Sequence, residues 1–449
     1  MSESTSAART RIADAASAIR YTARSPKLWV LAALLLVIAG IAQFAGALVI
    51  PLGIASLTIL PMVWGIIGGG FASAQPWKRM PLDMQHAAGV LMGVAVMVLC
   101  ARLSFTLGPN ISILFTAGPA LLLQEVGHLF GTILLALPLA VLLRMGPATV
   151  GATFSIDREG SFAMVSERYG ADSPQYRGVL SMYVFGTLFG AILVSLIASL
   201  ATSTGVFDPL ALAMGAGVGS GSMMAAAAAV VQQAHPEMGD QVLAVATASN
   251  LITGILGVYV GIFVALPLAD RLYRLLARGR FAVAAAEPAP VQRARMEQAA
   301  TPPAVTLSSW LAVAVLAVVG VVVASIAHRG FDVTIVLGWV LMALLAMAGF
   351  GLSRLTRGRV PAIAWVISIG ALATTPVSPV ADAVLASVAS IDFLSVCTVV
   401  LTIAGLSLGK DLPLLKSIGW KIIPVGIVSI AASYLVSVVI AEFALGLWG

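Results

Sequence analysis

Charged residues and cysteines are scarce in this 449-residue chain, and each shortage excludes a class of protein. Asp, Glu, Lys and Arg make up 10% of the residues, whereas hydrophobic residues make up 60%. A water-soluble core cannot bury so much apolar surface, so we expect the lipid bilayer to surround most of the chain. The two cysteines, Cys100 and Cys397, lie far apart in apolar runs, which excludes a disulfide framework and a CxxC metal or redox pair.

Sequence motifs of membrane proteases and of ATP-driven pumps are also missing. The four histidines lack the HExxH spacing, and no Walker motif occurs. Ser220 is followed by glycine, but Val218 stands where a rhomboid-type GxSG motif has glycine, and Asp157 and Asp392 lie in unlike contexts for a facing aspartate pair. We therefore expect no enzyme, no catalytic residues, no metal site and no organic cofactor. The formal net charge of +6 fits basic cytoplasmic loops better than binding to nucleic acid.

Apolar runs near twenty residues long recur along the chain, without the alternation of polar and apolar residues that is typical of barrel strands. They predict an all-α integral membrane protein with about 11 transmembrane helices. These are expected near residues 28–45, 48–72, 85–105, 111–143, 177–203, 240–268, 307–327, 332–353, 360–379, 383–408 and 422–447.

Basic residues gather in five clusters, at 9–27, at Lys78 and Arg79, at 271–295, at 354–359 and at 410–421. Because basic loops stay on the cytoplasmic side, we expect all five clusters, and with them the N-terminus, on the cytoplasmic side of a bacterial inner membrane. That placement results if two stretches, 147–175 and 207–237, enter the membrane and leave it by the same side. The sequence therefore predicts two re-entrant hairpins that enter from opposite faces.

The first of these stretches contains GATFSIDREGSFAMVSERYG, residues 151–170, where charged residues stand among apolar ones. One charge at the centre of a span costs ~2.5–3.5 kcal/mol, so this group needs a polar cavity or the cytoplasm. A solvated cytoplasmic loop is one reading, and a hairpin whose tip lines a substrate cavity is the other. On the second reading Ser155, Arg158 and Ser161 bind substrate, while Asp157 and Glu159 are candidates for binding a coupling ion.

The second stretch contains MGAGVGSGSMMAAAAAVVQQ, residues 214–233. Gly219 and Gly221 let the backbone bend and approach a ligand, and Ser220 and Ser222 add hydroxyl groups beside the start of a half-helix. Free backbone amides at such a break favour an anionic group, although small residues also serve close helix packing. Asn250, in the following span, is a further candidate for substrate binding.

A third polar group lies within the apolar run LLLQEVGHLF, residues 121–130. Gln124, Glu125 and His128 recur there at helical spacing, and ionisable residues inside a span are candidates for function. Glu125 could carry a coupling proton or help to bind sodium, and His128 could hydrogen-bond a substrate. The alternative is a mutually satisfied polar pair that joins this helix to a neighbour.

The runs QEVGHLFGTILLALPLAVLL, GATFSIDREGSFAMVSERYGADSPQYRGV, YVFGTLFGA and GVGSGSMMAAA resemble a bacterial family of multi-spanning membrane proteins known by a domain-of-unknown-function label, over most of residues 110–275. More distantly, the order of elements is similar to that of bacterial lysine exporters and glutamate–sodium symporters, and residues 405–436 resemble a lysine-exporter repeat. This resemblance implies an elevator-type secondary transporter with inverted repeats, in which paired hairpins hold the substrate. At the breaks, SIDREGS and GVGSGSMM replace the signatures of those families, so the resemblance implies the architecture and no substrate.

The expected units are a cytoplasmic N-terminal segment (1–27), scaffold helices (28–110), a transport core (111–275), a cytoplasmic linker (276–306) and a second helical block that is mainly scaffold (307–449). The expected activity is secondary transport of a small polar or anionic solute, an amino acid or a carboxylate, coupled to sodium or protons. A channel is the main alternative, because re-entrant hairpins also build selectivity filters. Beyond the bilayer and the solute, the scaffold-rich second block suits a homodimer.

Overall fold

The computed structural model describes residues 19–52, 55–154, 156, 165, 168–169, 173–277, 305–357, 360–410, 412 and 419–448. Eight helical segments in this part of the chain are long and apolar enough to cross a membrane. They are α2 (Pro26–Ala45), α4 (Leu82–Leu107), α6 with η1 and α7 (Gly118–Leu142), α10 (Pro174–Ser203), α16 (Ser309–Ala327), α17 (Val333–Leu355), α20 with η5 (Phe393–Lys410) and α22 (Ile422–Trp448). The chain is therefore a helical, multi-pass membrane protein.

The remaining elements complete the described chain. They are β1 (Ile19–Tyr21), β2 (Leu48–Leu52), β3 (Ala55–Ile59), α3 (Pro61–Ala74), α5 (Ile111–Thr116), α8 (Ala148–Thr153), α11 (Pro209–Ala216), α12 (Gly221–Ala234), η2 (Pro236–Met238), α13 (Gly239–Val260), η3 (Gly261–Ala265), α14 (Leu266–Leu276), β4 (Val305–Leu307), α18 (Ala362–Ala373) and α19 (Ala381–Val388). The strands form two small ladders, a parallel pair β1–β4 and an antiparallel pair β2–β3.

Three predicted spans are not among these eight helices. The run 48–72 is not one helix, since β2 and β3 form a hairpin there and α3 begins only at Pro61. Proline explains both features, because Pro51 cannot continue a helix whereas Pro61 fits the first helical turn. The run 360–379 gives only the 12-residue helix α18, which ends at Ala373 shortly before Pro376. The run 240–268 is helical, as α13, η3 and the start of α14, but it is not among the helices apolar enough to cross a membrane, so the described residues hold eight such helices rather than about eleven.

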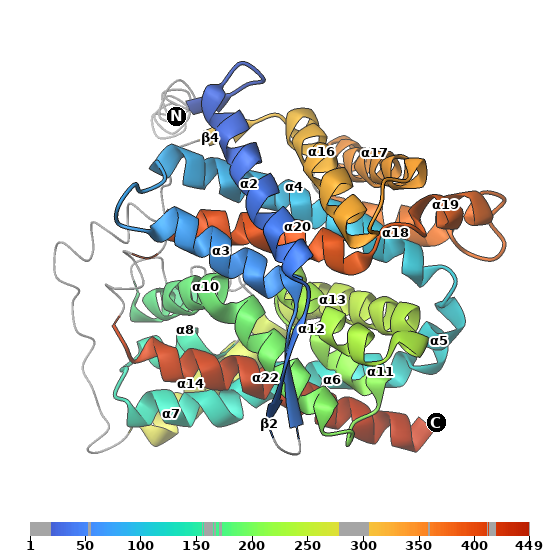
Figure 1. The fold of residues 1–449 in the computed structure, drawn as a ribbon. Coiled ribbons are helices and arrows are strands. Elements are labelled where there is room, and N and C mark those ends of the chain that lie inside the picture. The colour runs from blue at the N-terminus through green and yellow to red at the C-terminus, as the bar shows by residue number, and fades with distance from the viewer. Residues whose placement is uncertain are drawn as a thin grey trace, which may run out of the picture.

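Two groups of helices divide the molecule in Figure 1. The upper group holds α2, α3, α4 and α16 to α20, whereas α6 to α8, α10 to α14 and the C-terminal helix α22 form the lower group. Between the groups, α12 contacts α10 and α13 on one side and α4 and α20 on the other. α12 therefore lies at the boundary between the two groups.

The C-terminal helix packs directly on α6 through small residues. A Cβ atom added to Gly127 would lie 2.6 Å from the Cα of Ser437, and one added to Gly131 would lie 2.8 Å from the carbonyl oxygen of Ala432. This spacing of small residues allows two membrane helices to approach closely. α22 is thus brought beside the helix that carries Gln124 and Glu125, although about three hundred residues of sequence separate them.

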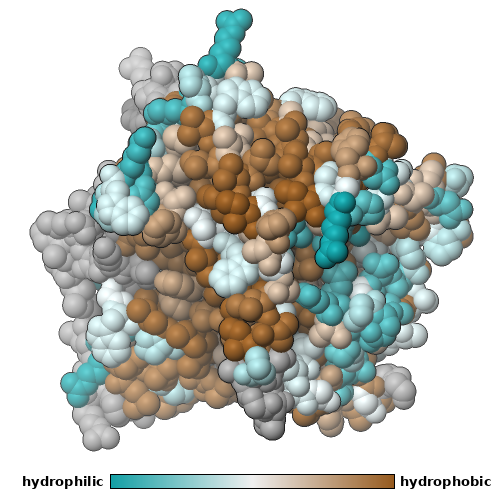
Figure 2. All heavy atoms as spheres, viewed as in Figure 1, coloured by the Kyte–Doolittle hydropathy of each residue, from teal (hydrophilic) through white to brown (hydrophobic). Residues whose placement is uncertain are grey.

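The outer surface of the helices is apolar. Figure 2 shows hydrophobic residues over much of the visible face and hydrophilic residues gathered towards its edges. Large apolar side chains point outwards from the spans: Phe44 of α2 is 85% exposed and Val318 of α16 is 66% exposed. An apolar surface of this extent is expected where helices contact lipid.

Candidate functional site

The helix is interrupted between α11 and α12, at residues 217–220, and we call this interruption the break. Asp208 caps the start of α11 by accepting a hydrogen bond from the Leu210 amide (2.7 Å). The helix stops after Ala216, and Gly219 adopts a φ of 78°, a conformation that favours glycine. Ser220 then caps α12, its hydroxyl accepting from the Met223 amide (3.4 Å). The predicted break and the start of the half-helix are present.

Two consecutive residues of α13 hold this break in place. The Asn250 side-chain amide donates to the carbonyl oxygens of Gly217 (2.7 Å) and Gly219 (3.1 Å). The Ser249 hydroxyl donates to the carbonyl oxygen of Met214 (2.7 Å). Side chains of α13 therefore satisfy the carbonyl groups of Gly217 and Gly219, as an apolar surrounding requires, and Ser249 adds a second donor to the Met214 carbonyl, which also accepts from the Gly217 amide. The predicted Asn250 thus supports the backbone of the break.

A buried polar cluster lies one helical turn further along α13. The Thr253 hydroxyl donates to Glu125 Oε2 at 2.7 Å, and Gln124 Nε2 lies 3.5 Å from the Thr253 hydroxyl. Gln124 and His128 are fully buried and Glu125 is 4% exposed. Asn250 and Thr253 stand three residues apart, on one face of α13. One face of one helix therefore joins the break to Glu125 of α6.

The C-terminal helix completes the cluster. His128 Nδ1 and the hydroxyl oxygen of Ser433 lie 2.6 Å apart, and the Ser437 hydroxyl donates to the carbonyl oxygen of Gln124 (3.1 Å). Within the described part of the chain, Gln124 Oε1 is buried without a hydrogen-bond partner. A buried polar atom in this condition costs free energy, so a bound water, ion or solute would be favoured beside it.

The two serines of the break also lie together. The hydroxyl oxygens of Ser220 and Ser222 are 3.0 Å apart, within hydrogen-bond distance. Ser222 lines a cavity of about 50 Å³ with Thr187 of α10 and Ser407 of α20. The break is therefore adjacent to a small void between the two helical groups, whose otherwise apolar walls carry these three hydroxyl groups.

Only part of the first stretch, 147–175, can be compared with its prediction. Ser155, Asp157, Arg158, Glu159 and Ser161 lie outside the described residues, so their roles stay predictions. Ile156 is described and 5% exposed, and its Cδ1 would lie 3.6 Å from a Cβ atom placed on Gly219. This residue of the first stretch therefore reaches the break in the second.

Three site residues were missed by the sequence reasoning. Thr253 stands three residues after Asn250, and Ser433 and Ser437 belong to a buried series with Ser429 in which every fourth residue of α22 is serine. A serine stripe at helical spacing in an apolar run was the signal that would have indicated a polar helix face.

A short repeat follows two of the three helices that carry the cluster, α6 and α13. The sequence ALPLA occurs at 136–140 and at 265–269. In each case five π-helical residues, η1 (Thr132–Ala136) and η3, precede the leucine–proline pair. Proline has no amide hydrogen to donate, so the widened turn accommodates it, and such turns are frequent at functional sites. Among the described residues no group of three or more His, Cys, Asp or Glu could hold a metal ion.

A family model described as protein of unknown function (DUF3100) matches residues 40–275. The matched region includes the break, the α6 residues and α13, whereas α22 lies beyond it. No curated protein and no solved structure matches the chain significantly. The comparisons therefore give a family and no substrate.

Proposed function

The chain belongs to the DUF3100 family, and we propose that it is a secondary transporter, not an enzyme, for a small polar or anionic solute such as an amino acid or a carboxylate. The observation that carries this proposal is the broken helix α11–α12, which α13 ties to the buried residue Glu125. Irregular backbone at membrane depth is tolerated where it is buried in protein or lines a cavity. Broken helices of this kind hold substrate in secondary transporters.

The start of α12 has the chemistry of an anion site. Its first amides have no helical acceptors, and the helix dipole places partial positive charge there. Ser220 and Ser222 supply hydroxyls that can orient a carboxylate. Substrate binding at Gly219, Ser220, Gly221 and Ser222 accounts for the glycines as well, because a backbone without side chains admits a ligand to its amides.

We infer that α11 and α12 form a re-entrant hairpin. The Asp208 amide, before α11, donates to Glu442 Oε2 near the end of α22 (2.7 Å), whereas Gly215 lies beside Tyr434 and Val438, further inside that helix. α12 then contacts α11, η2 and the adjoining helix α13, and the far continuation of α13, α14, contacts α7 and α8. These contacts support entry and exit by one side, with residues 147–175 entering from the opposite side.

Coupling is proposed to act through Glu125. A proton or sodium ion bound by its carboxylate would change the hydrogen bond from Thr253, and α13 transmits that change to Asn250 and the break. His128 would contribute its imidazole to the same site.

In an elevator mechanism the lower helical group, with the break at its edge, would slide past α4 and α20. We expect the transporter to lie in the bacterial inner membrane, with a cytoplasmic N-terminus, and to act as a homodimer.

The proposal is tested by a ligand screen with purified chain. Amino acids, dipeptides and carboxylates are added with and without sodium at two pH values, and thermal unfolding is followed. A solute at 100 times its Kd stabilises the folded state by ~2.7 kcal/mol, a readable shift. Each active solute is then tested for sodium- or pH-driven accumulation in proteoliposomes.

Three variants connect the result to the site. Asn250→Ala should lose the shift produced by the solute, whereas Thr204→Ala, at an exposed residue between α10 and α11, should keep it. Glu125→Gln should retain solute binding and lose its dependence on sodium or pH. Uncoupled flux that only follows the solute gradient would indicate a channel and contradict the proposal.

A further inference from the structure

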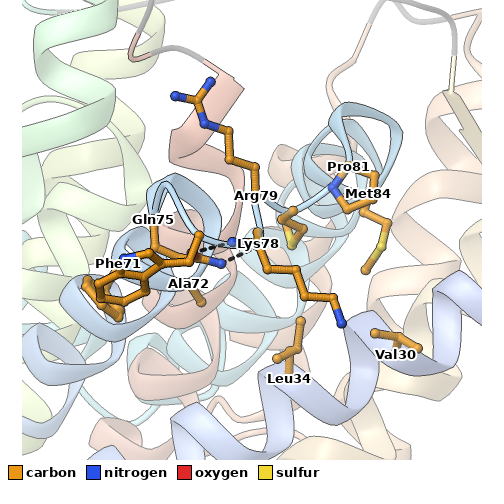
Figure 3. A pocket seen from close by; sticks show the side chains of 11 residues that line it. Val30, Leu34, Phe71, Ala72, Gln75, Lys78, Arg79, Pro81 and Met84 are labelled. Atoms are coloured by element: carbon orange, nitrogen blue, oxygen red, sulfur yellow. Dashed lines mark hydrogen bonds between the residues drawn. The ribbon is translucent and has the colours of Figure 1, made fainter.

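A separate pocket lies where α2 meets the loop between α3 and α4. Its volume is about 550 Å³, and it is distinct from the residues proposed to bind solute. Figure 3 shows Val30 and Leu34 of α2 along one side, and Phe71 and Ala72 of α3 with Met84 of α4 around the remainder. The walls are therefore mostly apolar and come from three helices.

Two cations stand at this apolar pocket. Lys78 and Arg79 both line it and are both exposed, and the Lys78 side chain extends across the pocket towards Val30 and Leu34 (Figure 3). None of the residues that line the pocket is acidic. The nearby carboxylate of Asp83 is engaged elsewhere, with Lys27 Nζ at 2.7 Å and the Tyr21 hydroxyl at 2.9 Å. Among the described residues, no ion pair neutralises Lys78 or Arg79.

The loop that carries these cations is held in a defined shape. The Lys78 amide donates to Gln75 Oε1 (2.8 Å), and Gln75 Nε2 donates back to the Lys78 carbonyl oxygen. Phe71 and Trp77 pack edge to face, with ring centroids 5.9 Å apart. Trp77 is 81% exposed, as is typical of a tryptophan at the membrane–water interface. These contacts hold the backbone of the loop in place at Trp77 and Lys78. Less backbone entropy is therefore lost when a ligand binds to Lys78.

We propose that this pocket binds an anionic phospholipid. Its phosphate contacts Lys78 and Arg79, and one acyl chain lies along Val30, Leu34 and Phe71. A free inorganic anion would leave the apolar walls unused, and a zwitterionic lipid would bring its own cation towards two others. Basic pockets between membrane helices are suited to anionic head groups in this way. The bound lipid would join α2 to the α3–α4 loop.

The experiment measures lipid binding to the full-length purified chain by native mass spectrometry. Phosphatidylglycerol is compared with phosphatidylcholine of the same acyl chains, and glycerophosphoglycerol, the head group without chains, is added as a competitor. We expect phosphatidylglycerol to bind more tightly than phosphatidylcholine, and the soluble head group to compete poorly. Equal binding of the two lipids, or displacement by the head group at the same concentration as by the lipid, would overturn the proposal.

Variants separate the charge from the apolar wall. The double variant Lys78→Gln/Arg79→Gln should bind phosphatidylglycerol about 25-fold more weakly, since one basic residue near an anionic lipid contributes about fivefold. Arg354→Gln/Lys421→Gln removes the same charge outside the pocket and should bind as the wild type does. Ala72→Leu keeps both charges but fills the pocket, and it should also weaken binding. Wild-type affinity in the first variant, or an equal loss in the control, would refute the site.

Discussion

Gly217 leaves no room for a side chain at the break. A Cβ atom there would overlap the Ser249 hydroxyl and lie 2.8 Å from the backbone nitrogen of Asn250. We expect Gly217→Ala to lower the free energy of unfolding by about 1–3 kcal/mol, because α13 must move away from the break. Thermal unfolding of the purified variant measures this loss.

The matched control is Gly221→Ala. Its Cβ would meet only the Val96 Cγ1, at 3.4 Å, which is ordinary van der Waals contact. The control should unfold near the wild-type temperature, and alanine at a helix start replaces a residue of lower helix propensity. In the structure α13 lies close to Gly217 but not to Gly221. An equal loss of stability in both variants would contradict this difference.

At the scale of elements, the contact between α6 and α22 positions half of the polar cluster. Gly127→Ala would place a Cβ 2.6 Å from the backbone of Ser437 and separate the two helices. We expect a loss of about 1–3 kcal/mol in stability together with a weaker response to solute, because Ser433 and Ser437 move away from α6. Gly118→Ala, at the start of the same helix and with nothing within 4 Å of its Cβ, is the control for both measurements. Unchanged unfolding of the Gly127 variant would rule out this interface.

The cap of α17 predicts a dependence of stability on pH. Asp332 accepts a hydrogen bond from the Thr334 amide (2.8 Å), and this bond lowers the pKa of its carboxyl below the usual value. A lowered folded-state pKa means that the stabilising contribution is present above the unfolded pKa of about 3.9 and is lost as pH falls through the folded pKa. Asp332→Asn keeps an acceptor oxygen but does not titrate, so its unfolding temperature should lie below that of the wild type near neutral pH and approach it in acid. A difference that stays constant on acidification would contradict the prediction.

Elements differ in how far the sequence could predict them. The break at 217–220 was predictable, since Gly219 and Ser220 act locally on the backbone that contains them. The polar residues Glu125 and His128 were predictable because ionisable groups are rare in spans. The serine stripe of α22 indicates a polar helix face, but its pairing with His128 and with the Gln124 carbonyl was not predictable, because a contact across about three hundred residues leaves no local signal in a single sequence. The hairpin β2–β3 was missed for another reason, since apolar strands and apolar helices have similar compositions over short runs.

On the scale of the whole molecule, the break lies at the edge between two helical groups. α12 touches α4 and α20 of one group and α10 and α13 of the other. The cavity at Ser222 has walls from both groups, including Ile66 of α3 and Ala191 of α10. A solute bound at the start of α12 would therefore move with one group relative to the other, which is the geometry that the proposed elevator mechanism needs.

The arrangement of the chain across the membrane gives a decisive prediction. A re-entrant α11–α12 hairpin puts Thr204, before α11, and Glu237, after α12, on the same side, whereas a full crossing would put them on opposite sides. Both residues are exposed, and so are Arg24 and Arg271, which belong to the basic clusters expected in the cytoplasm. The native Cys100 and Cys397 are buried and should contribute little background.

Single cysteines at these four positions are treated in intact cells with a membrane-impermeant maleimide, and total labelling is measured after lysis. We expect labelling of Thr204→Cys and Glu237→Cys in intact cells, and labelling of Arg24→Cys and Arg271→Cys only after lysis. Labelling of Thr204→Cys without Glu237→Cys would mean that α11 and α12 cross the membrane as one interrupted span. The break would then still be held by Asn250, but the linker would change sides and the paired-hairpin mechanism would no longer apply.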